Sequence, residues 1–131
     1  MHTDPIADML TRIRNAGTAK HKKVDMPVSR PKLEIARLLQ ENNYIANYKV
    51  IGEGVQSQLR VYLKYFAENE PTIRGLQRVS TPGRRVYRGA GGLPRVQNGM
   101  GMAIVSTSRG MLTDAQSRQA GVGGEVVALV W

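Results

Sequence analysis

The chain has 131 residues, 41% of them hydrophobic, and its 19 Lys and Arg outnumber 10 Asp and Glu to give a net charge of +9 at pH 7. It contains no cysteine, which excludes disulfides, thiol catalysis and thiolate metal sites, and no apolar run reaches the roughly 20 residues that span a bilayer. A domain this basic favours a polyanionic partner such as nucleic acid, whereas a merely solubilising surface needs less charge and mixes both signs.

The first half of the chain predicts an α-β-α-β-β unit. Asp4-Pro5 is typical of a helix start, and apolar residues at helical spacing continue that helix to about Ala16-Gly17. Ser29 or Arg30 caps a second helix that ends at Asn42-Asn43. Strands are expected at 24–28, 45–51 and 58–65, the first of them at a sheet edge because Pro27 cannot donate to a ladder.

The segment 58–65 alternates strictly in polarity. Leu59, Val61, Leu63 and Tyr65 share one face, and residues 60, 62 and 64 share the other. This period of two predicts a strand that is buried on one side only.

The second half predicts a β-rich subdomain with one short helix, so the fold class is α+β. Residues 1–66 are the predicted N-terminal subdomain, 67–72 a polar linker, and 73–131 the C-terminal subdomain. Strands are expected at 73–79, 84–87, 100–105 and 126–131. Thr113 with Gln116 forms a capping-box pattern that opens the helix, and Gly121 ends it.

Charge is distributed unevenly along this second half. Between Glu70 and Asp114 lie 43 residues with no acid and seven arginines. Arginine suits bidentate contacts with phosphates and bases. A source genome whose base composition favours arginine codons would also produce this excess of arginine over lysine.

Three consecutive hydroxyl residues, Ser106, Thr107 and Ser108, suggest a nucleophile, a phosphate cradle or a surface that contacts nucleic acid. Nucleophilic catalysis needs a nearby base, but the only histidines are His2 and His21, and the second half has no lysine. Neither glycine cluster fits a nucleotide-binding motif. We therefore expect no enzyme, no metal and no cofactor. A nucleic-acid-processing enzyme and an architectural binder of duplex DNA are the alternatives to an RNA-binding protein.

The segment RVSTPGRRVYR, residues 78–88, places four arginines around Tyr87. An exposed Tyr87 would stack on an unpaired base, whereas a buried one would be a core residue with solvated arginines beside it. Glu125 is one of two acids after Glu70. It would accept hydrogen bonds from the hydroxyl loop or from RNA, or form an ion pair with an arginine.

Three blocks, at 4–16, 78–87 and 106–131, resemble a bacterial family, that of the eighth protein of the small ribosomal subunit. The resemblance implies an α/β N-terminal domain packed against a mostly β C-terminal domain. It implies a primary binder of the central domain of small-subunit rRNA that nucleates platform assembly beside neighbouring ribosomal proteins. It also implies a ribosomal location, in the cytoplasm or in an organelle, and in some bacteria repression of the operon's own messenger RNA.

The resemblance also implies RNA-binding residues on two surfaces. The hydroxyl loop would contact bases and backbone, Tyr87 would pack on a base or ribose, and Gly123, Gly124 and Glu125 would complete the surface. The other members of this surface are Arg84, Arg85, Arg88 and Arg109. A second RNA region would face Thr3, Asp4, Arg12, Arg14 and the basic segment 20–32, which includes Lys22 and Lys32. Gly89–Gly92 replaces a charged segment of the family, which weakens the case for RNA contacts there.

Overall fold

The computed structural model describes residues 4–66 and 70–131. Its contacts divide the chain into two compact units: an N-terminal unit, Ile6–Arg74, and a C-terminal unit that joins the described part of Met1–Pro5 to Gly75–Trp131. Helices and antiparallel strands occur in both, which confirms the predicted α+β class. None of the helices in the described residues is long and apolar enough to cross a membrane.

The N-terminal unit has the predicted α-β-α-β-β order. Its elements are α1 (Pro5–Thr18), β1 (Lys23–Pro27), α2 (Arg30–Glu41), β2 (Ile45–Ile51) and β3 (Gln58–Leu63). Local signals account for these bounds: α1 begins at Pro5, and the Ser29 side chain caps α2 by accepting from the backbone N–H of Lys32. The predicted linker lies partly outside the described residues, and within it β5 (Glu70–Pro71) pairs with β4 (Tyr65–Phe66).

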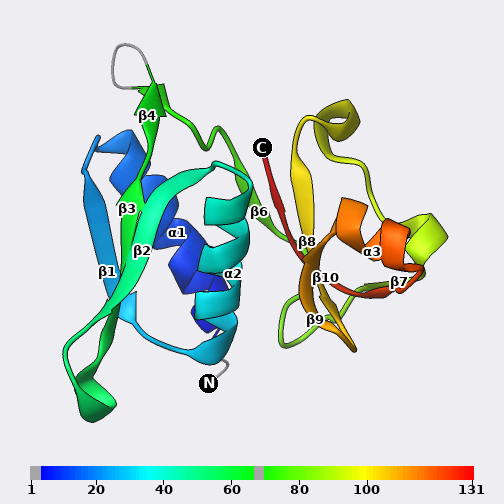
Figure 1. Ribbon diagram of the computed structural model, residues 1–131, viewed down its shortest axis with the longest axis horizontal. Helices are drawn as coiled ribbons and strands as arrows, with labels where there is room; N and C mark the ends of the chain where they lie inside the picture. Colours follow the sequence, from blue (N-terminus) through cyan, green and yellow to red (C-terminus); the bar gives the residue numbers. More distant parts are fainter. Residues whose placement is uncertain (1–3, 67–69) are drawn as a thin grey trace. The chain divides into compact units, whose positions relative to one another are not determined.

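The three long strands form an antiparallel sheet in the order β1-β3-β2, which places β1 at an edge, as Pro27 predicted. Both helices cover the same face of this sheet (Figure 1), and Leu59 and Val61 of the central strand are fully buried beneath them. Arg60 and Tyr62 project from the opposite face and are partly exposed. The predicted alternation is therefore confirmed over residues 59–62. The predicted strand is too long, because β3 ends at Leu63, which is itself partly exposed, and Tyr65 belongs to β4.

The C-terminal unit is mostly β. Its elements are β6 (Leu76–Arg78), β7 (Tyr87–Arg88), β8 (Met102–Thr107), β9 (Gly110–Thr113), α3 (Asp114–Ala120) and β10 (Gly124–Val130). The sheet order is β6-β10-β8-β9, and β7 also pairs with β10. Strand β9 was not predicted, because its four residues are too few to show a strand pattern and form a strand only by pairing with β8. The strand predicted at 84–87 is wrong except at Tyr87, where β7 begins, because Arg84 instead pairs with Thr81 across a turn.

Helix α3 has the predicted capping box, in which Thr113 and Gln116 each bond the other's backbone. Gly121 ends it with a φ of 70° in the left-handed region, where glycine is favoured.

A buried carboxylate fastens α3 to its surroundings. Asp114 is 5% exposed, accepts a hydrogen bond of 3.0 Å from the Ala103 backbone N–H, and forms a 2.8 Å ion pair with Arg118. Arg118 also donates to the carbonyls of Leu93 and Pro94. One acidic side chain thereby ties together a helix, a strand and a loop.

Candidate nucleic-acid interface

A row of three side chains crosses the sheet of the C-terminal unit. Glu125 of β10 lies opposite Tyr87 of β7 on one side and opposite Ser106 of β8 on the other. Residues directly opposite in antiparallel strands share a face, so these three side chains, here called the cross-strand row, are neighbours. Tyr87 is 64% exposed, which rules out the alternative that it is a core residue.

Glycines permit the strands of this row to approach one another closely. A Cβ on Gly124 would lie 2.1 Å from the Ser106 carbonyl oxygen, and a Cβ on Gly123 would lie 2.3 Å from the Arg88 carbonyl oxygen. Contacts this short are impossible, so only glycine allows β10 to fit between β7 and β8 here. The two glycines that the resemblance assigned to the surface thus shape it through the backbone.

The three hydroxyls have different surroundings. The Thr107 hydroxyl donates to the Gly110 carbonyl at 2.8 Å and accepts from the Arg109 backbone N–H at 3.0 Å, which closes the turn between β8 and β9. Gly110 has a φ of 97°, a left-handed conformation that this turn requires. Across residues 4–66 and 70–131, neither the Ser106 nor the Ser108 hydroxyl forms a hydrogen bond, and Ser108 and Arg109 are exposed at the tip. Ser106 and Ser108 therefore retain their capacity to bind a partner.

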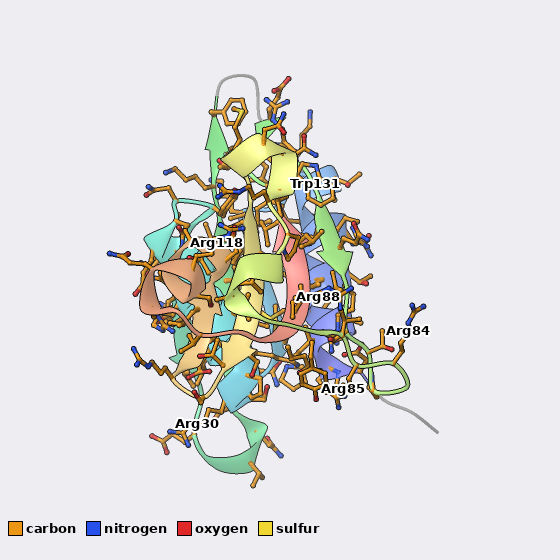
Figure 2. All side chains as sticks on the ribbon, turned by 90° about the vertical axis from the view of Figure 1, so that its right-hand side faces the viewer. Arg30, Arg84, Arg85, Arg88, Arg118 and Trp131 are labelled. Atoms are coloured by element: carbon orange, nitrogen blue, oxygen red, sulfur yellow. The ribbon has the colours of Figure 1, made fainter. Side chains whose placement is uncertain are left out.

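The loop between β6 and β7 presents Arg84. Ser80, fully buried, accepts from the Val86 N–H at 2.8 Å and donates to the Val86 carbonyl at 3.3 Å, which holds the two ends of the loop together. Figure 2 shows Arg84 at the end of this loop, pointing away from the ribbon. The part of the chain that the structure describes offers it no carboxylate within ion-pair distance. Ser80 was not predicted to shape this loop, because its only signal in the sequence is its place before the Thr-Pro-Gly turn.

Glu125 forms an ion pair, one of the alternatives left open by the sequence. Arg85 Nη1 lies 3.1 Å from Glu125 Oε2, and the glutamate side chain is mostly covered while that of the arginine is half exposed. Arg88 donates to the Tyr87 carbonyl at 2.9 Å. Both arginines therefore lie beside the cross-strand row, as the sequence predicted.

Arg78, the fourth arginine of this segment, is turned inward. Its guanidinium contacts Asp4 through bonds of 3.1 and 3.3 Å and donates to the Val127 carbonyl at 2.8 Å. Asp4 thus has an intramolecular partner, and its assignment to an RNA surface stays a prediction. Thr3 lies outside the described residues.

The remaining predicted residues belong to the N-terminal unit. Arg12 bonds Asp8 at 2.8 Å and the Asp25 carbonyl at 2.9 Å. Lys32 is only 4% exposed, its ammonium donates to the Pro27 carbonyl at 2.9 Å, and this burial lowers its pKa. A lysine that binds phosphate normally extends into water. Lys32 is therefore better placed to stabilise the junction between β1 and α2 than to contact RNA. Arg14 and Lys22 are exposed.

The arrangement in the C-terminal unit is suited to recognition. It combines an exposed aromatic ring, two hydroxyls with unused capacity, a carboxylate held by arginine, and exposed guanidinium groups. In residues 4–66 and 70–131, no group of three or more His, Cys, Asp and Glu side chains is close enough to hold a metal ion. The carboxylate that lies opposite Ser106 in the ladder, that of Glu125, is already paired with Arg85.

Comparisons with known proteins identify the family of this chain. Residues 4–131 match the family described as "Ribosomal protein S8". The chain is 56% identical to "Small ribosomal subunit protein uS8" of Geotalea uraniireducens, 57% to that of Geobacter sulfurreducens and 54% to that of Halalkalibacterium halodurans. Each match covers 98% of both chains. The chain therefore belongs to the ribosomal protein S8 family.

Proposed function

We propose that this protein is a structural constituent of the small ribosomal subunit that binds the central domain of small-subunit rRNA through its C-terminal unit. The cross-strand row carries the proposal, because an exposed ring, a paired carboxylate and an unoccupied hydroxyl meet on one face. The family relationship and the names of the relatives support the ribosomal part.

Each group has a chemical role in this proposal. Tyr87 stacks on an unpaired base or a ribose, and Arg84 and Arg109 contact phosphates. Ser106 and Ser108 exchange hydrogen bonds with base edges or 2′-OH groups. Glu125, which Arg85 holds in place, accepts a hydrogen bond from a 2′-OH or a base amino group. Because Arg85 neutralises its charge, Glu125 does not repel the RNA phosphates. Such a surface prefers an irregular RNA helix, because a regular duplex keeps its bases stacked internally.

Chemical footprinting on small-subunit rRNA tests the proposal. We expect protection confined to the central domain, and weak, salt-sensitive binding to generic duplex RNA and DNA. Tyr87→Leu should weaken binding by roughly tenfold through loss of stacking, whereas Tyr87→Phe, the matched control, should retain it. An unprotected central domain, or equal affinity for any duplex DNA, would contradict the proposal.

Three further experiments test translational repression, platform assembly and RNA cleavage. A fragment of the operon's own messenger RNA that competes with rRNA, and loses affinity in Tyr87→Leu in parallel, would extend the proposal to translational repression. Reconstitution of the subunit without the protein should impair the platform and the binding of neighbouring proteins. RNA turnover that disappears in Ser106→Ala would instead indicate an enzyme.

A further inference from the structure

The outer face of the sheet in the N-terminal unit carries an aromatic ring among cations. Arg60 and Tyr62 project from this face of β3, opposite the buried Leu59 and Val61. Lys23 of β1 lies directly opposite Tyr62 in the ladder. Cross-strand neighbours have Cβ atoms about 5 Å apart, so the lysine stem lies beside the ring.

A second lysine lies over the same ring. Lys49 Nζ is 5.5 Å from the centroid of Tyr62, a cation–π distance. The nearby Lys49 ammonium, and secondarily the Arg60 guanidinium, lowers the pKa of the Tyr62 hydroxyl, because a positive charge favours the ionised form. Lys49 is exposed and its stem is flexible, so its ammonium is able to leave the ring for a nearby anion at small cost.

Asp25 is the one acidic residue among β1, β2 and β3, and it is already paired. Arg60 holds both of its oxygens, with bonds of 2.8 and 3.0 Å. The pair is internally neutral, which leaves the charges of Lys23 and Lys49 uncompensated on the strands of this face. The face therefore has an excess of positive charge centred on a partly exposed aromatic ring.

We propose that this outer sheet face binds a single-stranded RNA segment, with one unpaired base stacked on Tyr62 and the adjoining phosphates on Lys23 and Lys49. Proteins that bind single strands combine a basic surface with aromatic side chains on which bases stack. An acidic protein segment would satisfy the two lysines but has no use for the ring between them. A duplex is disfavoured because its bases are not free to stack on a side chain. The site is separate from the cross-strand row and goes beyond the proposed function.

Binding of a fluorescently labelled oligouridylate to the full-length protein, followed by anisotropy, tests this site. We expect Tyr62→Leu to weaken binding by roughly tenfold, and Tyr62→Phe, which keeps the ring, to bind like the wild type. Lys49 is exposed, so Lys49→Gln leaves the core intact. It should reduce the magnitude of the slope of log affinity against log salt concentration by about 0.7. Circular dichroism of each variant shows that it is folded.

Photocrosslinking with 4-thiouridine locates the contact. We expect crosslinks to residues of β3 in the wild type and equally in Tyr87→Leu, which alters only the cross-strand row. Central-domain binding that fails while these crosslinks persist would contradict the proposed function and leave this inference standing. Equal affinity of Tyr62→Leu and wild type, or crosslinks confined to the C-terminal unit, would overturn it. Polyglutamate that binds this face regardless of Tyr62→Leu would also overturn it and indicate an acidic protein partner.

Discussion

The two units differ in the fraction of their arginines that form ion pairs with carboxylates. In the described residues, at least four of the six arginines of the N-terminal unit form ion pairs with carboxylates, against three of the seven in the C-terminal unit. The paired arginines are Arg12, Arg37, Arg60 and Arg74 in the first unit and Arg78, Arg85 and Arg118 in the second. Net charge alone thus does not tell which cations are available to a polyanion, because the placement of the acids decides it.

The ion pairs also differ in depth. Asp114 and Arg118 have side chains 8% and 23% exposed, whereas Arg37 and Glu41 are 38% and 48% exposed. Exposed ion pairs contribute little to stability because water and salt screen them. Removal of a buried carboxylate costs more, because it leaves its buried partners without a hydrogen bond or a counter-charge. The few acids of the C-terminal unit should therefore matter to its stability, and its unpaired arginines to its binding.

The largest expected effect is on stability, from Asp114→Ala. The change leaves Arg118 without its partner and the Ala103 N–H unsatisfied, which should lower the free energy of unfolding by about 3 kcal/mol. Urea unfolding followed by the fluorescence of Trp131, the only tryptophan of the chain, measures it. The matched change in the other unit, Glu41→Ala, should cost no more than about 0.5 kcal/mol. Similar losses in the two variants would remove the distinction between the units.

Arg84→Gln should produce the next largest effect, on RNA affinity. A charged hydrogen bond to phosphate contributes on the order of 2 kcal/mol at low salt, and its loss should reduce the salt slope by about one ion. Arg12→Gln is the control, since Asp8 and the Asp25 carbonyl already occupy Arg12. Titrations of central-domain RNA at several salt concentrations compare the two. A slope that falls as much in Arg12→Gln would show that internal pairing does not withdraw an arginine from RNA.

Local sequence signals predicted most of the fold. The caps at Ser29 and Thr113, the turn glycine at 121 and the alternation in β3 each depend on residues a few positions apart. Strand β9 was missed because its four residues carry no period of their own. Its pairing with β8 is what makes it a strand.

The site was predictable in its members but not in their arrangement. Tyr87, Ser106 and Glu125 come from three strands far apart in sequence, and only the ladder of β10 brings them into one row. The inward orientation of Arg78 and Lys32 was equally hidden, because their partners are Asp4 and the carbonyls of Val127 and Pro27. Residue type indicates that a cation is present, whereas tertiary contacts determine which way it points.

A smaller effect is expected within the hydroxyl loop. Ser108→Ala removes an exposed hydroxyl and should weaken binding of central-domain RNA by about 1 kcal/mol with no change in stability. Thr107→Val removes the two hydrogen bonds that close the turn, and should lower the free energy of unfolding by about 1 kcal/mol. Urea unfolding and RNA titration of both variants separate the roles. A loss of binding in Thr107→Val alone would mean that the shape of the turn, not the Ser108 hydroxyl, is what RNA contacts.

The smallest effect concerns the N-terminal unit and depends on pH. The hydrogen bonds from Arg60 lower the pKa of Asp25 below its ordinary value of 3.8. A carboxyl with a lowered pKa in the folded state stabilises the protein above the unfolded value, and this contribution is lost as the pH falls through the folded pKa. Asp25→Asn should therefore unfold at lower urea concentration near neutral pH, by a fraction of the Asp114→Ala effect, and the gap from wild type should close in acid below the ordinary pKa. Glu53→Gln, in the exposed turn between β2 and β3, is the control and should leave the urea midpoint almost unchanged. A gap between Asp25→Asn and wild type that stays constant into acid would mean that the asparagine disturbs packing, and that the charge of Asp25 contributes nothing through Arg60.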